Sequence, residues 1–143
     1  MIPAQPRLFK KKAARKKPVD REGLEQAALI TELKYRFPLA AKLIYHVPNG
    51  GHRHVLVAIK LKEQGVKAGV PDLVLPMARG GYFGLYIEFK AQPPYDAAVS
   101  PDQDAYLHML TEQGYLAIVC RGRVDAVTTI RDYMLQPPTR IAA

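Results

Sequence analysis

The stretch GVPDLVLPMARGGYFGLYIEFKA, residues 69–91, decides the fold of this 143-residue chain. It holds two apolar runs, 72–77 and 84–91, separated by Gly80 and Gly81. The second run alternates apolar and polar side chains, a pattern that is typical of a strand. A glycine-containing turn between two short strands predicts an antiparallel β-hairpin.

The hairpin predicts a pair of facing carboxylates. Folding it symmetrically about Gly80 places Asp72 opposite Glu88, unless a β-bulge shifts the register. Glu88 and Lys90 share one face of their strand because side chains alternate along it. Two facing carboxylates repel each other strongly in a protein interior, so a positive charge should lie between them. Lys90 is one candidate, which would make an ordinary ion cluster, and a divalent metal is the one we favour.

The regions on either side of the hairpin predict an α/β domain. Before it we expect a helix over 22–37, a strand over 42–47 and a helix over 55–64. After it we expect a helix starting at Ser100-Pro101, a strand over 116–120 and a helix over 124–135. The order is α-β-α-β-β-α-β-α, and a hairpin followed by a helical crossover implies a mixed β-sheet flanked by helices.

The charge of the chain is concentrated at one end. The net charge is +8, from 21 basic and 13 acidic residues, and seven of the basic residues lie within the first 17 positions with no acid among them. We therefore expect a flexible basic tail over 1–19, a domain over 20–136 and a C-terminal tail over 137–143. Such a tail favours contacts with nucleic-acid phosphates over a membrane surface, because only Leu8 and Phe9 offer it an apolar face.

Composition excludes several other classes of protein. An apolar fraction of 48% with 24% charged residues is typical of a folded domain. The single cysteine, Cys120, excludes an intrachain disulfide and a four-cysteine zinc site, and we expect it to be an inert core thiol. The spacing of His46, His52 and His54 matches no closed zinc site. With no long apolar run and no secretory signal, we expect a cytoplasmic protein, bacterial or phage-encoded, with no membrane partner.

Several motifs, in order, resemble those of a nuclease family. Pro71-Asp72 followed by Glu88-Phe89-Lys90 looks like the PD-(D/E)xK signature of metal-dependent restriction-type nucleases. The wider pattern adds Pro48-Asn49-Gly50-Gly51 and the run from Gly65 to Asp72, and it resembles the VRR-NUC (virus-type replication and repair nuclease) family. The resemblance spans about 22–133, leaves out the basic tail, and implies a restriction-endonuclease-like core.

The resemblance also implies roles for particular residues. Asp72 and Glu88 would bind Mg²⁺ or Mn²⁺, with the backbone carbonyl of Phe89 as a third ligand, and Lys90 would lie beside the attacking water. A glutamate of the first helix would join the metal site. Glu25 is the best match, and Glu22 and Glu32 are the alternatives.

Two further groups of residues are candidates for the site. Gln103 fits a capping box with Ser100, and the resemblance makes it an active-site residue near Glu88 and Lys90. Gln26 is a weaker candidate, which either contacts the site or only faces it. The candidates for contact with nucleic acid are Asn49, Gly50, Arg53, Lys62 and Lys67.

These residues predict a metal-dependent DNA endonuclease that needs no small-molecule cofactor. The resemblance favours branched DNA, such as flaps or four-way Holliday junctions, in replication or repair, and a homodimer, because one small domain needs two sites to cut two strands. The alternative function is a non-catalytic DNA-binding protein that uses its basic tail. Against that alternative, Asp72 and Glu88 would repel phosphate unless a metal lay between them.

Overall fold

The computed structural model describes residues 13–49 and 54–142. Gly50 and Arg53, two of the predicted nucleic-acid contacts, lie outside these residues. Within them the order is α1 (Arg21–Arg36), α2 (Pro38–Leu43), β1 (Tyr45–His46), α3 (Val55–Glu63), β2 (Leu73–Leu75), β3 (Leu85–Lys90), α4 (Pro101–Glu112), β4 (Leu116–Arg121) and α5 (Arg123–Met134). These strands form a sheet in the order β1-β2-β3-β4. The β1–β2 and β2–β3 pairs are antiparallel and the β3–β4 pair is parallel, which confirms the predicted mixed α/β sheet.

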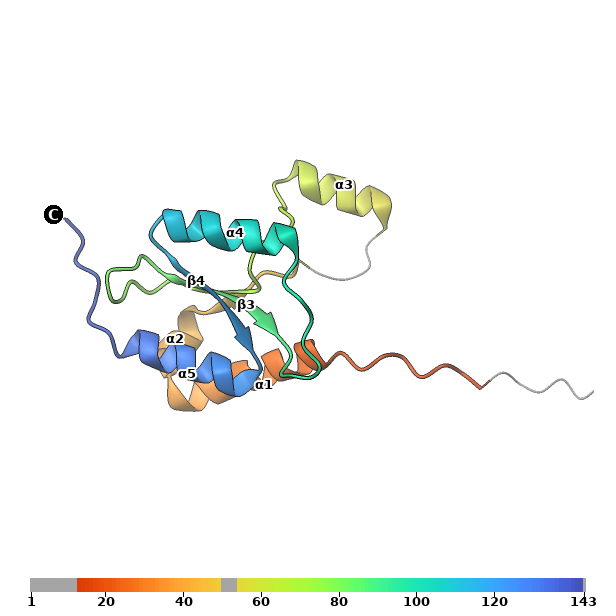
Figure 1. Ribbon diagram of the computed structural model, residues 1–143, viewed down its shortest axis with the longest axis horizontal. Helices are drawn as coiled ribbons and strands as arrows, with labels where there is room; N and C mark the ends of the chain where they lie inside the picture. The colour runs from red at the N-terminus through yellow and green to blue at the C-terminus, as the bar shows by residue number, and fades with distance from the viewer. Residues whose placement is uncertain (1–12, 50–53, 143) are drawn as a thin grey trace, which may run out of the picture.

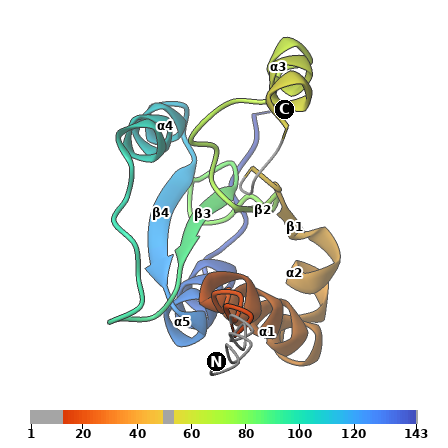
Figure 2. The same ribbon diagram turned by 90° about the vertical axis from the view of Figure 1, so that its right-hand side faces the viewer.

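The sheet lies between two layers of helices. α4 covers one face, and α1, α2 and α5 lie against the other (Figures 1 and 2). The main core fills the space on the α1 and α5 side, where α1 contributes Leu29 and Leu33 and α5 contributes Ile130 and Tyr133. Leu85, Ile87 and Phe89 of β3 point into this core. The opposite face of β3 therefore presents Glu88 and Lys90 on the side of α4.

The register of the hairpin agrees with the prediction. Leu73 pairs with Ile87, and Leu75 pairs with Leu85, with no bulge between them. The next position along the same register brings Asp72 level with Glu88. The turn of the hairpin is held by the end of the chain, because Gly80 N donates to Pro137 O and Thr139 N donates to Ala78 O.

The predicted strand over 42–47 is wrong over most of its length. Pro38 ends α1, as expected, but it also occupies the first turn of a further helix, α2, which runs to Leu43. Proline suits that position because it needs no backbone N–H there, and the following Leu-Ala-Ala-Lys-Leu residues are good helix formers. Only Tyr45 and His46 pair with β2. The element order therefore contains one helix that the apolar pattern did not reveal.

α3 was predicted nearly to the residue, but it packs differently from the other helices. No residue of α3 is buried, and its apolar side chains Val55, Leu56, Val57 and Ile59 are exposed. Figure 1 shows this helix standing away from the sheet. None of the helices in the part of the chain that the structure describes is long and apolar enough to cross a membrane.

Candidate active site

The hairpin brings Asp72 and Glu88 together on the α4 side of the sheet. Asp72 follows the buried Pro71 and directly precedes β2. Its Oδ2 accepts a hydrogen bond from the backbone N of Phe89 at 2.9 Å, which fixes the carboxylate against β3. Glu88, on β3, is only 1% exposed, and Lys90 is 5% exposed. Two acids and one base are therefore gathered at one end of the hairpin, largely away from water.

Gln103 connects these charged side chains to α4. Its Nε2 donates to Glu88 Oε1 at 2.6 Å, and its Oε1 accepts from Lys90 Nζ at 3.1 Å. The same Oε1 accepts from the backbone N of Ser100 at 2.9 Å, and Ser100 Oγ accepts from the backbone N of Gln103. Gln103 thus belongs to the capping box and also contacts the predicted catalytic residues. The capping box is confirmed, and the position of Gln103 beside Glu88 and Lys90 is compatible with the active-site role that stays a prediction.

A glycine allows the first turn of α4 to approach Asp72 closely. Gly69 has a φ of +82°, a backbone conformation that side chains with a Cβ disfavour. A Cβ at this position would collide with the backbone of Asp102, in the first turn of α4. The loop before Asp72 can therefore lie directly against the start of α4. This contact closes one wall of a cavity of about 330 Å³ that is lined by Asp72, Glu88 and Gln103.

The electrostatics of Glu88 are unfavourable in the protein alone. Burial and, second to it, the nearby Asp72 carboxylate raise the pKa of Glu88 from 4.5 to about 8, although Lys90 opposes both effects. Lys90 Nζ lies 3.5 Å from Glu88 Oε1, the oxygen that also contacts Gln103. The other oxygen, Oε2, is buried and has no hydrogen-bond partner. A buried carboxylate oxygen without a partner beside a second carboxylate is the arrangement that a cation would stabilise.

The first helix places Glu22, rather than Glu25, at this cavity. Glu22 lines it together with Asp72 and Glu88. Burial raises the pKa of Glu22, and the Asp72 carboxylate raises it further. Glu25 instead accepts a hydrogen bond from the backbone N of Gln92 at 2.9 Å, in the loop after β3. The third candidate, Glu32, pairs with Arg123 at 2.8 Å and does not line the cavity.

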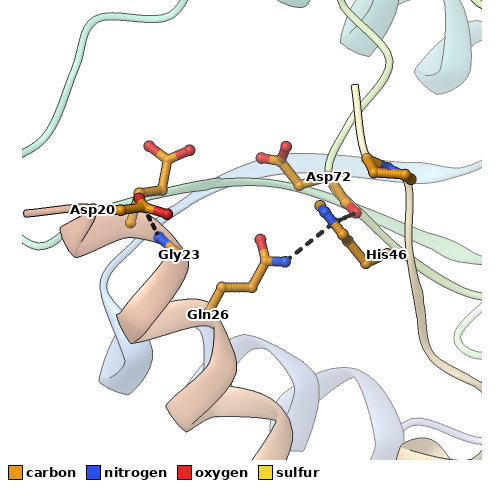
Figure 3. A pocket seen from close by; sticks show the side chains of 7 residues that line it. Asp20, Gly23, Gln26, His46 and Asp72 are labelled. Carbon is orange, nitrogen blue, oxygen red and sulfur yellow. Dashed lines mark hydrogen bonds between the residues drawn. The ribbon is translucent and has the colours of Figure 1, made fainter. Parts of the chain in front are cut away.

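A second cavity, of about 450 Å³, borders Asp72 on the side of α1. It is lined by Glu22, Gln26 and His46 as well as Asp72. Figure 3 shows Gln26 of α1 reaching toward His46, whose Nδ1 lies 3.1 Å from Gln26 Nε2 and 2.9 Å from the backbone O of Asp72. From the sequence, His46 was a candidate only for a zinc site. Its place in β1, paired beside the start of β2, is the signal that could have assigned it to the neighbourhood of Asp72.

The described candidates for nucleic-acid contact differ in their distance from the site. Asn49 lines the same cavity as Asp72 and Glu88, and its Nδ2 donates to the backbone O of Lys67 at 2.5 Å. The side chains of Lys62 and Lys67 are exposed. His54, which the zinc hypothesis included, instead caps α3 by accepting from the backbone N of Leu56 at 3.3 Å.

The donor set of the cavity fits a hard divalent cation. Among residues 13–49 and 54–142, no three side chains of histidine, cysteine, aspartate or glutamate form a group able to hold a metal. Mg²⁺ does not require such a group, because it keeps several waters and binds through one or two carboxylates together with substrate phosphate oxygens. Asp72 and the unpartnered Oε2 of Glu88 meet that requirement.

Comparisons with known proteins identify the family of this chain. The family model of the VRR-NUC domain matches residues 20–124. A solved structure named "VRR_NUC domain protein" is similar to this chain with a TM-score of 0.73 and 28% sequence identity, over 88% of this chain and 100% of that chain. No curated protein matches the sequence. The chain therefore belongs to the VRR-NUC family of nuclease domains.

Proposed function

We propose that this protein is a Mg²⁺- or Mn²⁺-dependent endonuclease that hydrolyses phosphodiester bonds in DNA. The observation that carries the proposal is the buried carboxylate of Glu88, which faces Asp72 and has one oxygen without a partner. Such a pair lowers the stability of the metal-free protein and gives nothing to a protein that only holds phosphate. It becomes favourable when a divalent cation binds both carboxylates.

Asp72, Glu88 and the backbone carbonyl of Phe89 would hold the cation, and we propose Glu22, which lines the cavity with both carboxylates, in preference to Glu25 as the carboxylate that α1 contributes. A divalent cation bound there would lower the pKa of a coordinated water and neutralise charge on the phosphate. Lys90 Nζ contacts Gln103 and Glu88, two residues that line the cavity, so its ammonium group is held beside the cavity, where we propose that it orients the water or a phosphate oxygen. Gln103 positions both of these residues through α4.

The proposal is tested with purified protein and labelled duplex, nicked, flapped and four-way DNA. Cleavage should require Mg²⁺ or Mn²⁺ and stop with a chelator. Asp72→Asn and Lys90→Ala should each abolish it while DNA binding survives. Asp104→Asn, which changes an exposed carboxylate of α4, serves as the matched control and should cleave normally. Full cleavage by both site variants, or cleavage in excess chelator, would refute the proposed site.

We further propose that the protein acts on branched DNA as a homodimer. One domain carries one pair of hairpin carboxylates, so paired incisions in two strands need two copies. Light scattering should give twice the 16.0 kDa mass of the chain. A monomeric mass with full cleavage of both strands would contradict this assembly.

The basic residues of the tail favour a second candidate function, DNA binding without cleavage. Seven positive charges within the first 17 residues suit contacts with phosphates that do not depend on base sequence. Deleting residues 1–17 should weaken DNA binding and flatten its dependence on salt, while cleavage at saturating DNA persists. If the full chain binds DNA but cleaves none of the substrates with either metal, the binding function replaces the nuclease.

A further inference from the structure

A third cavity, of about 450 Å³, lies directly beside the candidate active site. It shares Asn49 and Val70 with the cavity that holds Asp72 and Glu88. Its walls come from the segment after β1, from the end of α3 and the loop that follows, and from Tyr106 of α4. We call this cavity the side pocket. A ligand that occupies the active-site cavity can therefore extend into the side pocket past Asn49 and Val70.

The lining of the side pocket differs from that of the active site. It is mainly aliphatic, with Leu61, Val66 and Val70, and it includes the aromatic ring of Tyr106. Polar side chains also line it, among them Asn49 and Gln64. No carboxylate lines it, so it offers nothing to a cation. A flat ligand with apolar faces and hydrogen-bonding edges matches this distribution of groups.

We propose that the side pocket receives the nucleobase of an unpaired nucleotide next to the scissile phosphate. The inference rests on the proposed nuclease function, because that function places a phosphate at Asp72 and Glu88. A base one sugar away from that phosphate reaches the aliphatic walls across Asn49 and Val70. Tyr106 offers a ring on which the base stacks, as aromatic side chains do for single-stranded nucleic acids.

The proposal gives the enzyme a physical reason to select branched or frayed DNA. A base paired within a duplex must leave the stack before it can enter the pocket, which costs free energy. For an unpaired base this cost is small. Lys67 also lines the pocket, and its exposed side chain can neutralise the backbone of the incoming strand. Selection would thus come from the availability of an unpaired base and not from the sequence of the DNA.

The protein variants for the test come from a single helix. Leu61→Trp fills the side pocket from α3 with a larger side chain. Leu56→Trp places the same side chain on the same helix, where Leu56 is exposed and does not line the pocket. α3 buries no residue, so neither substitution disturbs the core. Tyr106→Ala removes the stacking ring from the opposite wall and provides an independent variant on α4.

The substrate for the test is a forked DNA whose cleavage site is first mapped with wild-type protein and Mg²⁺. A single abasic residue is then moved through the nucleotides on both sides of that site. At one flanking position, loss of the base should lower kcat/KM about tenfold for the wild type and for Leu56→Trp. For Leu61→Trp and Tyr106→Ala, kcat/KM on the intact fork should be about tenfold lower than for the wild type. The abasic residue should not lower kcat/KM of these two variants any further.

A binding measurement gives a readout that does not depend on cleavage. With Ca²⁺ in place of Mg²⁺, 2-aminopurine at the sensitive position should change fluorescence on binding to wild type and Leu56→Trp but not to Leu61→Trp. Equal cleavage of every abasic substrate by the wild type would overturn the pocket and leave the nuclease intact. An abasic effect of the same size in Leu61→Trp and Tyr106→Ala would also overturn it. Absence of cleavage from every DNA refutes the proposed function, and an unchanged signal from forks that carry 2-aminopurine at each unpaired position in turn then removes the pocket as well.

Discussion

Replacing Glu88 with glutamine should make the metal-free protein less sensitive to pH. Glutamine keeps the shape of the protonated acid and an oxygen that can accept from Gln103 Nε2. In the wild type, the pKa of Glu88 is raised by burial and by Asp72 from 4.5 to about 8. Between these values the folded state holds a proton on Glu88 that the unfolded state has lost. Wild-type stability must therefore fall as pH rises from 4.5 to 8 and then level off.

The size of the effect follows from the same two pKa values. The difference between 4.5 and about 8 corresponds to at most about 5 kcal/mol, at about 1.4 kcal/mol for each tenfold change in proton affinity. Relaxation of the site and entry of water on ionisation reduce this ceiling, so we expect about 2–4 kcal/mol. That is a large share of the roughly 5–15 kcal/mol that stabilises a domain of this kind.

Urea unfolding in a chelator, from pH 4.5 to pH 9, measures this effect. The free energy of unfolding of Glu88→Gln minus that of the wild type should rise by about 2–4 kcal/mol across this range. A difference in the free energy of unfolding between glutamine and protonated glutamate that does not depend on pH does not affect this change across the pH range. Glu112→Gln replaces an exposed glutamate of α4 and serves as the control. A difference that does not change between pH 4.5 and pH 9 would refute the assignment of Glu88 as a strained buried acid. Added Mg²⁺ should stabilise the wild type at pH 9 and have a much smaller effect on Glu88→Gln.

Three other substitutions or reactions test the same architecture. Gln103→Ala should lower kcat more than tenfold and the free energy of unfolding by about 1–3 kcal/mol, measured by cleavage and urea unfolding, because it removes three hydrogen bonds of the Gln103 side chain, one of which is its half of the capping box. An unchanged kcat would reduce Gln103 to its capping role. Gly69→Ala should lower the free energy of urea unfolding by more than about 1 kcal/mol, because Gly69 has a φ of +82° and an added Cβ would meet the backbone of Asp102. A more stable variant would contradict the backbone conformation described for Gly69. Burial raises the pKa of Cys120 to about 11, so a maleimide at pH 8 should label the folded protein on the order of 100-fold more slowly than the unfolded chain, and equal rates would place this thiol outside the core.

The sequence predicted the hairpin well because a local pattern determines it. Alternation along β3 predicts which side chains share a face, the two glycines predict the turn, and the register of β2 with β3 brings Asp72 opposite Glu88. The fold class followed from the order of apolar segments. α2 was missed because its first residue, Pro38, is both a stop for one helix and a good start for the next.

The choice of helix carboxylate depended on information that is not local. Glu22 and Glu25 lie three residues apart, so they share a face of α1 and the apolar pattern does not separate them. What separates them is where the loop after β3 meets the helix, since Gln92 takes Glu25 as its acceptor. His46 was missed as a neighbour of Asp72 for a similar reason, because its position depends on the pairing of β1 with β2.

The capping box at the start of α4 links catalysis to local unfolding. Gln103 can hold Glu88 and Lys90 only while the first turn of α4 is formed, because the same side-chain oxygen accepts from Ser100 N. Each transient opening of that turn therefore separates Gln103 from Glu88 and Lys90, the proposed catalytic residues, for as long as the opening lasts. Amide hydrogen exchange at Ser100 and Gln103 would then report the population of inactive molecules. A mutation far from the site that frays this turn would lower activity in proportion, without changing any residue that touches DNA.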